Sequence, residues 1–249
     1  MREKTVSSTA LLVGALALAA SAPLAVANGD DDVLFRIQAI DNDTNTLSVF
    51  EVNFGQGTQS GNSWFWEYTG EDAFNFGGDT SLGGFSSAAI EVNFDSRGFV
   101  STVNLGFDVF AGAGLTAFSI GSGPLNVASL TSVQGIASAS VGVTDVLGGG
   151  AELAPDGLGM YRAFTNGTDT FSDLLGSSLV AGEFSSAQDD ENFGLAAIGG
   201  TVTEIASEWN FTLTAFDTAA GTSTFSVTPA PGAVSLIGFA GLIAARRRR

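Results

Sequence analysis

Short segments in which apolar and polar residues alternate recur along the chain, separated by clusters of Gly, Ser, Thr, Asn and Asp. In residues 209–215 the apolar side chains fall on one face and the polar ones on the other, which is typical of an antiparallel strand with one buried face. Residues 47–54 and 136–143 alternate in the same way. Signals for helices are few by comparison. The chain therefore predicts an all-β protein.

The spacing of these segments predicts about ten short strands in one domain. They are expected at residues 33–37, 47–54, 64–68, 88–94, 98–110, 136–143, 160–164, 200–206, 209–216 and 222–227. A tight connection at Ser207–Glu208, a turn at residues 95–98, one helical turn at 171–175 and glycine-rich loops at 77–84 and 148–150 complete the expected outline. Such a series favours a single antiparallel β-sandwich of jelly-roll-like form over residues 28–228.

The chain contains no cysteine and no histidine. Disulfide bonds therefore cannot stabilise the fold, and its stability must come from the apolar core. Ser-His-Asp and Cys-His catalysis and zinc sites built from His and Cys are excluded. Lys4 is the single lysine, so the body has none for a phosphate-binding loop or a Schiff base. Among catalytic chemistries, that of carboxylates is left, for instance a glycosidase pair.

Glu67 and Glu71 are the candidates for such a pair, because they flank the aromatic segment 64–68. Alternation along that segment places Trp64, Trp66 and Tyr68 on one face and Phe65 and Glu67 on the other. Three aromatic residues on one face form part of a core more often than a carbohydrate platform. The sequence thus favours a core role for these three residues, and a carbohydrate platform is the alternative.

Negative charge dominates the body. Outside the two end segments, Arg36, Arg97 and Arg162 stand against 25 of the chain's 26 acidic residues, a formal charge of −22. Such a surface repels nucleic acid and anionic lipid, which excludes both as partners. It attracts hard cations such as Ca²⁺ or cationic surfaces, or it serves solubility alone. Residues 189–192 are expected to form an acidic loop.

Residues 41–45 carry the spacing that begins many calcium-binding loops, with Asp41, Asp43 and Asn45 as the candidate ligands. The sixth and twelfth positions are Thr46 and Val52, where an EF-hand has Gly and Glu, so the EF-hand interpretation fails. A turn between two strands, in which Asp and Asn side chains accept local N–H groups, is the favoured alternative. Calcium is the one cofactor considered.

The C-terminus has three parts: Thr228–Pro231, an apolar run at residues 232–245, and the four arginines Arg246, Arg247, Arg248 and Arg249. A helix over the 14 apolar residues would be about 21 Å long, whereas a bilayer core is about 30 Å thick. The arginines would stay on the cytoplasmic side. This tail predicts a temporary membrane stop and not a lasting anchor.

The N-terminus predicts a secretory signal peptide over residues 1–27. A weakly basic start precedes the apolar stretch 10–20, and Ala25 and Ala27 form a small-x-small site with cleavage expected before Asn28. No cysteine follows that site, so a lipoprotein anchor is excluded. The chain thus divides into a signal peptide, an exported domain at residues 28–228 and a sorting tail at residues 229–249.

The tail resembles the PEP-CTERM sorting signal, in a variant with Pro229, Ala230 and Pro231 in place of Pro-Glu-Pro. The resemblance covers only the tail. It implies export from a Gram-negative bacterium through the Sec translocon and transient anchoring in the inner membrane. It also implies removal of the helix by an exosortase-type enzyme and association with exopolysaccharide or biofilm matrix.

Together these features predict a non-catalytic protein that is secreted or held at the cell surface. Two alternatives stay open. One is a secreted carbohydrate-active enzyme that uses carboxylates, and the other is a calcium-dependent adhesin.

Overall fold

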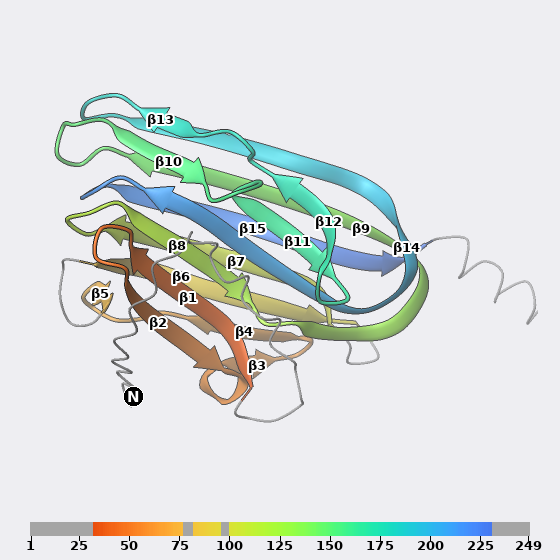
Figure 1. The fold of residues 1–249 in the computed structure, drawn as a ribbon. Helices are drawn as coiled ribbons and strands as arrows, with labels where there is room; N and C mark the ends of the chain where they lie inside the picture. Colours follow the sequence, from red (N-terminus) through yellow and green to blue (C-terminus); the bar gives the residue numbers. More distant parts are fainter. Residues whose placement is uncertain (1–31, 77–81, 96–99, 231–249) are drawn as a thin grey trace, which may run out of the picture.

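The computed structural model describes residues 32–76, 82–95 and 100–230 (Figure 1). Most of these residues lie in antiparallel strands that join into one 15-stranded sheet, and no α-helix occurs within these ranges. The all-β prediction is confirmed. A search of the same ranges for a helix long and apolar enough to cross a membrane finds none.

Every expected strand overlaps a strand of the structure. The strands are β1 (Val33–Asp41), β2 (Thr46–Asn53), β3 (Thr58–Ser60), β4 (Ser63–Glu67), β5 (Phe74–Asn75), β6 (Gly83–Phe94), β7 (Val100–Ala111), β8 (Thr116–Ser122), β9 (Leu125–Thr144), β10 (Ala151–Pro155), β11 (Tyr161–Thr165), β12 (Asp169–Leu174), β13 (Leu179–Ala181), β14 (Ser186–Leu213) and β15 (Thr218–Pro229). A 3₁₀ turn, η1 (Phe54–Gln56), follows β2.

Strand β14 is 28 residues long and overturns two predictions. The tight connection expected at Ser207–Glu208 is wrong, because both residues stay in the strand and pair with Ala163 and Arg162 of β11. Ser207 looked like a turn residue, yet it is buried and its hydroxyl lies 2.9 Å from the hydroxyl of Tyr161. The acidic loop expected at residues 189–192 is also wrong, because these residues pair with β9 inside the same strand.

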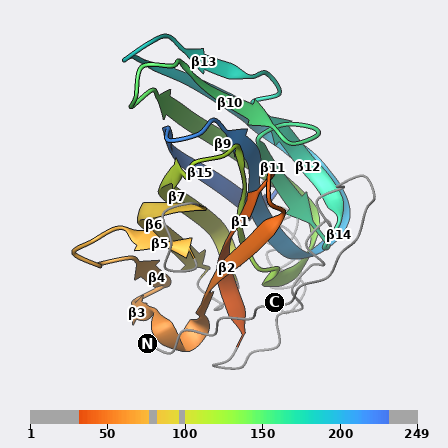
Figure 2. The same ribbon diagram turned by 60° about the vertical axis from the view of Figure 1, so that its left-hand side comes forward.

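The length of β14 makes the sheet curl (Figure 2). Its first part pairs with β9, whereas its last residues pair with β8 on one side and with β10 and β11 on the other. One part of the sheet, here the short arm, runs through β2, β1, β8 and the end of β14. The other, the long arm, runs from the start of β14 through β9, β15, β7, β6, β4 and β3.

The core lies between the two arms and is rich in aromatic rings. Trp209 and Phe211 of β14 lie 5.3 and 5.6 Å, between ring centroids, from Phe107 of β7. Phe35 of β1 contacts Trp66 of β4 at 5.7 Å. These contacts join opposite arms, so the curl buries the apolar face of each arm against the other.

The polar groups of Trp209 and Tyr161 within this core are paired. The indole Nε1 of Trp209 donates to the Ser223 hydroxyl at 3.0 Å. Burial raises the pKa of the Tyr161 hydroxyl to about 12, although the hydroxyls of Ser207 and Ser223 favour the charged form. Tyr161 is therefore a neutral core residue.

The helical turn expected at residues 171–175 is wrong, because Phe171 lies in strand β12. Its ring stacks on Phe225 of β15 at 5.2 Å and meets the edge of Phe193 of β14 at 5.1 Å. Packing of this aromatic side chain over the long arm outweighs the weak local helix signal.

The glycine-rich loops are confirmed in part. Residues 148–150 connect β9 to β10, as expected. Gly83 and Gly84 instead begin β6, and a Cβ at Gly84 would collide with the backbone oxygen of Phe74. Residues 77–81 of this expected loop lie outside the described residues. Residues 96–98 of the turn expected at 95–98 lie outside them as well.

Candidate binding groove

The outward face of the long arm aligns residues from six strands into rows across the sheet. Partners in neighbouring strands point to the same face, so strand pairing alone defines each row. The first row consists of Glu67, Ala89, Gly106, Thr222, Ser140 and Asp190. The second row consists of Phe65, Glu91, Asn104, Thr224, Ser138 and Asn192.

A groove follows the first row because its centre carries small side chains. An open cavity of about 410 Å³ lies over Ala89 and Gly106 and includes Glu67. A second of about 340 Å³ includes Asp190. The two cavities share Ser140 and Thr222, so they form one groove with a carboxylate near each end.

The groove is long and shallow. It crosses six strands, and five strand spacings of about 4.8 Å give a length of about 24 Å. A Cβ built at Gly106 meets no atom within 4 Å, so this glycine faces open space. Such dimensions suit an extended chain better than a compact small molecule.

Hydrogen-bonding side chains line the groove. Asn104 donates from Nδ2 to Glu91 Oε2 at 3.1 Å within the second row. Among the described residues, no hydrogen bond engages the side chains of Ser140, Thr222 or Asn192. Their hydroxyl and amide groups are therefore available to a polar ligand.

The aromatic segment takes the core role that the sequence favoured. Trp64 and Trp66 are 1% and 8% exposed and belong to the core, so the carbohydrate platform is wrong. Tyr68 packs against the same core, with its ring 5.0 Å from that of Phe85. The opposite face of β4 turns Phe65, which is 41% exposed, and Glu67 toward the groove rows.

The structure does not bring the candidate catalytic carboxylates into one cavity. Glu67 lines the groove, whereas Glu71 lies on an exposed bend after β4 and is not part of the lining. The remaining groove residues come from five segments spread along the chain between Ser87 and Thr224. No local sequence signal marks them, and only the pairing of the strands shows that they meet.

The candidate calcium ligands form the turn between β1 and β2. Asp41 Oδ1 accepts the backbone N–H groups of Asp43 at 2.8 Å and Thr44 at 3.1 Å. Asn45 has a left-handed φ of 54°. Within the described ranges, no three acidic side chains are placed to hold a metal ion together. The turn is confirmed, and calcium binding stays a prediction.

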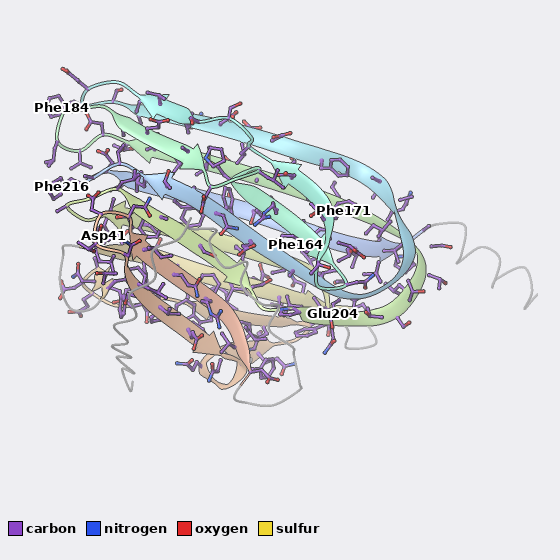
Figure 3. All side chains as sticks on the ribbon, in the orientation of Figure 1. Asp41, Phe164, Phe171, Phe184, Glu204 and Phe216 are labelled. Carbon is purple, nitrogen blue, oxygen red and sulfur yellow. The ribbon has the colours of Figure 1, made fainter. Side chains whose placement is uncertain are left out.

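Loops gather at the end of the molecule where Asp41 lies (Figure 3). Phe184 and Phe216 lie at this end and are 74% and 49% exposed. Asp145 connects the loop between β9 and β10 to the loop between β13 and β14. Its carboxylate accepts the N–H group of Phe184 at 2.7 Å and those of Gly148, Gly150 and Gly149 at 3.0 to 3.3 Å.

These contacts set the charge state of Asp145. Burial would raise its pKa, but the amides of Phe184, Gly150, Gly148 and Gly149 together hold the pKa below the ordinary value of 3.8. A lowered folded-state pKa stabilises the fold fully above the unfolded-state pKa, and this contribution is lost as the pH falls through the folded-state value.

We expect Asp145→Asn to lower the thermal unfolding midpoint at neutral pH, because the amide replaces one acceptor oxygen with a donor. The difference in unfolding midpoint between the variant and the parent protein should shrink as the pH falls below 3.8 toward the lowered pKa of Asp145. Calorimetry from neutral to acidic pH measures both effects. Asp169→Asn removes the same charge at an exposed position and serves as the control. Equal midpoints for the two variants at neutral pH would contradict this role of Asp145.

The predicted sorting motif begins at the last residue of β15. Pro229 is the last residue of β15 and is exposed, and the N–H of Ala230 donates to the Ser132 carbonyl at 2.8 Å. Pro231, the arginines Arg246 to Arg249, and the predicted cleavage residues Ala25, Ala27 and Asn28 lie outside the described residues.

Comparisons with known proteins add no function. A scan against models of protein families finds no match, and a search of curated proteins finds none either. Two solved structures are distantly similar, that of infectious bursal disease virus Gt strain and that of the infectious bursal disease virus VP2 subviral particle. The first is 12% identical over 87% of this chain and 73% of the viral chain, with a TM-score of 0.16. The second is 14% identical over 88% and 73%, with a TM-score of 0.14. Likeness at this level carries no argument.

Proposed function

We propose that the chain is a non-catalytic exported protein of a bacterial cell surface or extracellular matrix. The Sec translocon exports it, an exosortase-type enzyme removes its tail, and the body associates with exopolysaccharide. Its final location is the cell surface or the medium of a Gram-negative bacterium, after transient anchoring in the inner membrane.

One observation carries this proposal: the last described strand, β15, ends at Pro229, the first residue of the predicted motif, and this residue is exposed. Every strand of the described ranges ends at or before Pro229. Removal of the chain beyond Ala230 therefore costs the sheet none of its described strands. The exposure of Pro229 also supports access by a processing enzyme.

The groove supports association with an extended glycan. It crosses the outer face of the long arm and is open along its length. Small apolar residues such as Ala89, Gly106 and Ala220 line its middle, and hydroxyl, amide and carboxylate groups surround them. The finer form of the body belongs to the same proposal: a β-sandwich of jelly-roll-like form, supported by the aromatic contacts between the two arms.

We expect deletion of residues 231–249 to abolish C-terminal processing and surface retention, because it removes the membrane stop and leaves β15 intact. Western blotting of cell, membrane and medium fractions measures the outcome. Replacing Pro229 and Pro231 by Ala, with the apolar run kept, should give an unprocessed membrane-bound protein. Unchanged processing and location in both variants would contradict the proposal.

A secreted carbohydrate-active enzyme is the second candidate, because Glu67 lies in the groove. Glycosidases pair two carboxylates across the scissile bond, and Glu67 would need a facing partner. Release of reducing sugar from a bound glycan, lost in Glu67→Gln, would favour this candidate. The calcium-dependent adhesin is tested by calorimetric titration of the protein with Ca²⁺.

A further inference from the structure

We propose that the groove binds a polysaccharide that carries free amino groups, such as a deacetylated polymer of N-acetylhexosamine. The inference rests on the proposed function, because it names the chemistry of the glycan that the exported protein would hold. Three features of the groove lead to this proposal: its negative charge, its small number of aromatic rings and its direction across the strands.

Carboxylates are spread along the groove and beside it. Glu67 and Asp190 lie at the ends of the first row, and Glu91 lies in the second row. Asp108 projects from the same face of β7, two residues from Gly106. A protonated amine forms charge-assisted hydrogen bonds with a carboxylate, which are stronger than those of a neutral hydroxyl.

No cation balances these carboxylates on the described surface. Within the described ranges the basic residues are Arg36 and Arg162. Arg36 lies 2.7 Å from Glu51, and Arg162 lies 3.3 Å from Glu208, so each is engaged by an acid outside the groove rows. A polysaccharide of uronic acids would therefore be repelled from this face, whereas a cationic one is attracted.

A neutral glycan fits less well because the groove offers little aromatic surface. Apolar sugar faces stack on aromatic rings. Phe107 is the one aromatic residue in the lining of the two cavities, and its ring is buried against Trp209, while Phe65 of the second row lies outside the lining. Trp64 and Trp66 of the same strand are committed to the core. Affinity must therefore come mainly from polar and charged contacts.

An extended peptide fits less well because the groove runs across the strands. The backbone groups beneath it already pair within the sheet, as between Thr222 and both Gly106 and Ser140. A peptide strand would find no open sheet edge for main-chain hydrogen bonds. Sugar hydroxyls instead meet the hydroxyls of Ser140 and Thr222 and the amide of Asn192.

The test is calorimetric titration of the exported protein with glucosamine oligosaccharides at mildly acidic pH. We expect saturable binding that weakens between about 20 mM and about 300 mM salt, because salt screens exposed charges. The fully N-acetylated oligosaccharide should bind at least about tenfold more weakly, since it lacks the ammonium groups. Equal or tighter binding of the acetylated form would overturn the proposal.

Variants separate the groove from the general charge of the protein. Glu67→Gln combined with Asp190→Asn should weaken binding about tenfold. The double variant Glu152→Gln and Glu183→Gln changes the net charge equally at exposed sites outside the groove and should bind as the parent does. Equal losses in both variants would show attraction to the whole surface and overturn the assignment.

Gly106→Ile supplies a steric test. Because a Cβ at this position meets open space, the variant is expected to fold, and its side chain should block the middle of the groove. We expect loss of binding with an unchanged unfolding midpoint. Full affinity in this variant would overturn the groove as the site.

Oligouronate binding supplies the last discrimination. Binding of oligouronate only in the presence of Ca²⁺ would overturn the proposal and favour the calcium-dependent adhesin. If the glucosamine oligosaccharides do not bind but the protein is exported and trimmed normally, the amino-glycan inference alone is overturned. A protein that is neither exported nor trimmed would sink the proposed function, whatever the titrations show.

Discussion

Replacing Trp209 with alanine is expected to lower the free energy of unfolding by about 4 kcal/mol. The side chain is fully buried, and its ring lies between Phe107 of β7 at 5.3 Å and Tyr161 of β11 at 5.2 Å. Its loss would open a cavity where the end of β14 packs on the long arm. It would also leave the hydroxyl of Ser223 without its indole donor.

Urea unfolding followed by circular dichroism measures this change. Trp209→Phe is the matched control, because it keeps most of the ring volume and removes the Nε1–H. We expect a loss of about 1.5 kcal/mol for this variant, from the unpaired Ser223 hydroxyl and the smaller ring. An alanine variant less than about 1 kcal/mol below the parent would contradict the central place of Trp209 in the core.

A second large effect is expected for Phe85→Ala, also about 4 kcal/mol. Phe85 is fully buried in β6, and its ring lies 5.0 Å from Phe50 of β2 and 4.9 Å from Phe74 of β5. The outermost strand of the short arm thus packs on the long arm through this side chain. Its removal should loosen the closure of the two arms as well as leave a cavity.

Phe65→Ala is the matched control for Phe85→Ala, because it removes the same ring from an exposed position of the long arm. We expect a loss below about 1 kcal/mol for this control in the same urea experiment. Amide hydrogen exchange should show faster exchange in β1 and β2 for the Phe85 variant alone. Similar losses of stability in the two variants would contradict the proposed packing.

The sequence predicts strands where apolar and polar residues alternate. It does not predict that β14 continues past a polar pair and changes its pairing partners along its length. Residues 209–213 alternate clearly, and they are strand in the structure. The polar pair Ser207 and Glu208 resembles a turn, and the pairing of these residues with β11 and β8 shows that the strand continues. Long-range pairing overrides such local signals in sheets.

The groove could not be predicted from the sequence for the same reason. Gly106, Thr222 and Asp190 are small or polar residues with no motif around them, and they become a site only because three strands place them in one row. The aromatic neighbours of Glu67 mark it in the sequence as a candidate catalytic carboxylate. Its partners across the sheet, however, depend on the order of the strands, which local patterns do not encode.

The register of the long arm links the fold to the proposed function. A slip of β15 by one residue against β9 would turn Thr222 toward the core and Phe225 toward solvent, and Thr222 would leave the row that contains Ser140. The buried ring of Phe225, stacked on Phe171, therefore fixes the row that forms the groove. Core packing on one face of the sheet determines which polar groups meet on the other.

The most direct test of the account is mass spectrometry of the native protein recovered separately from cells and from the medium. The account predicts a surface or released protein that begins at Asn28 and ends within or just after the motif Pro229–Pro231, without the apolar run and the four arginines. A protein that retains residues 232–249 and fractionates with the cytoplasm would contradict it.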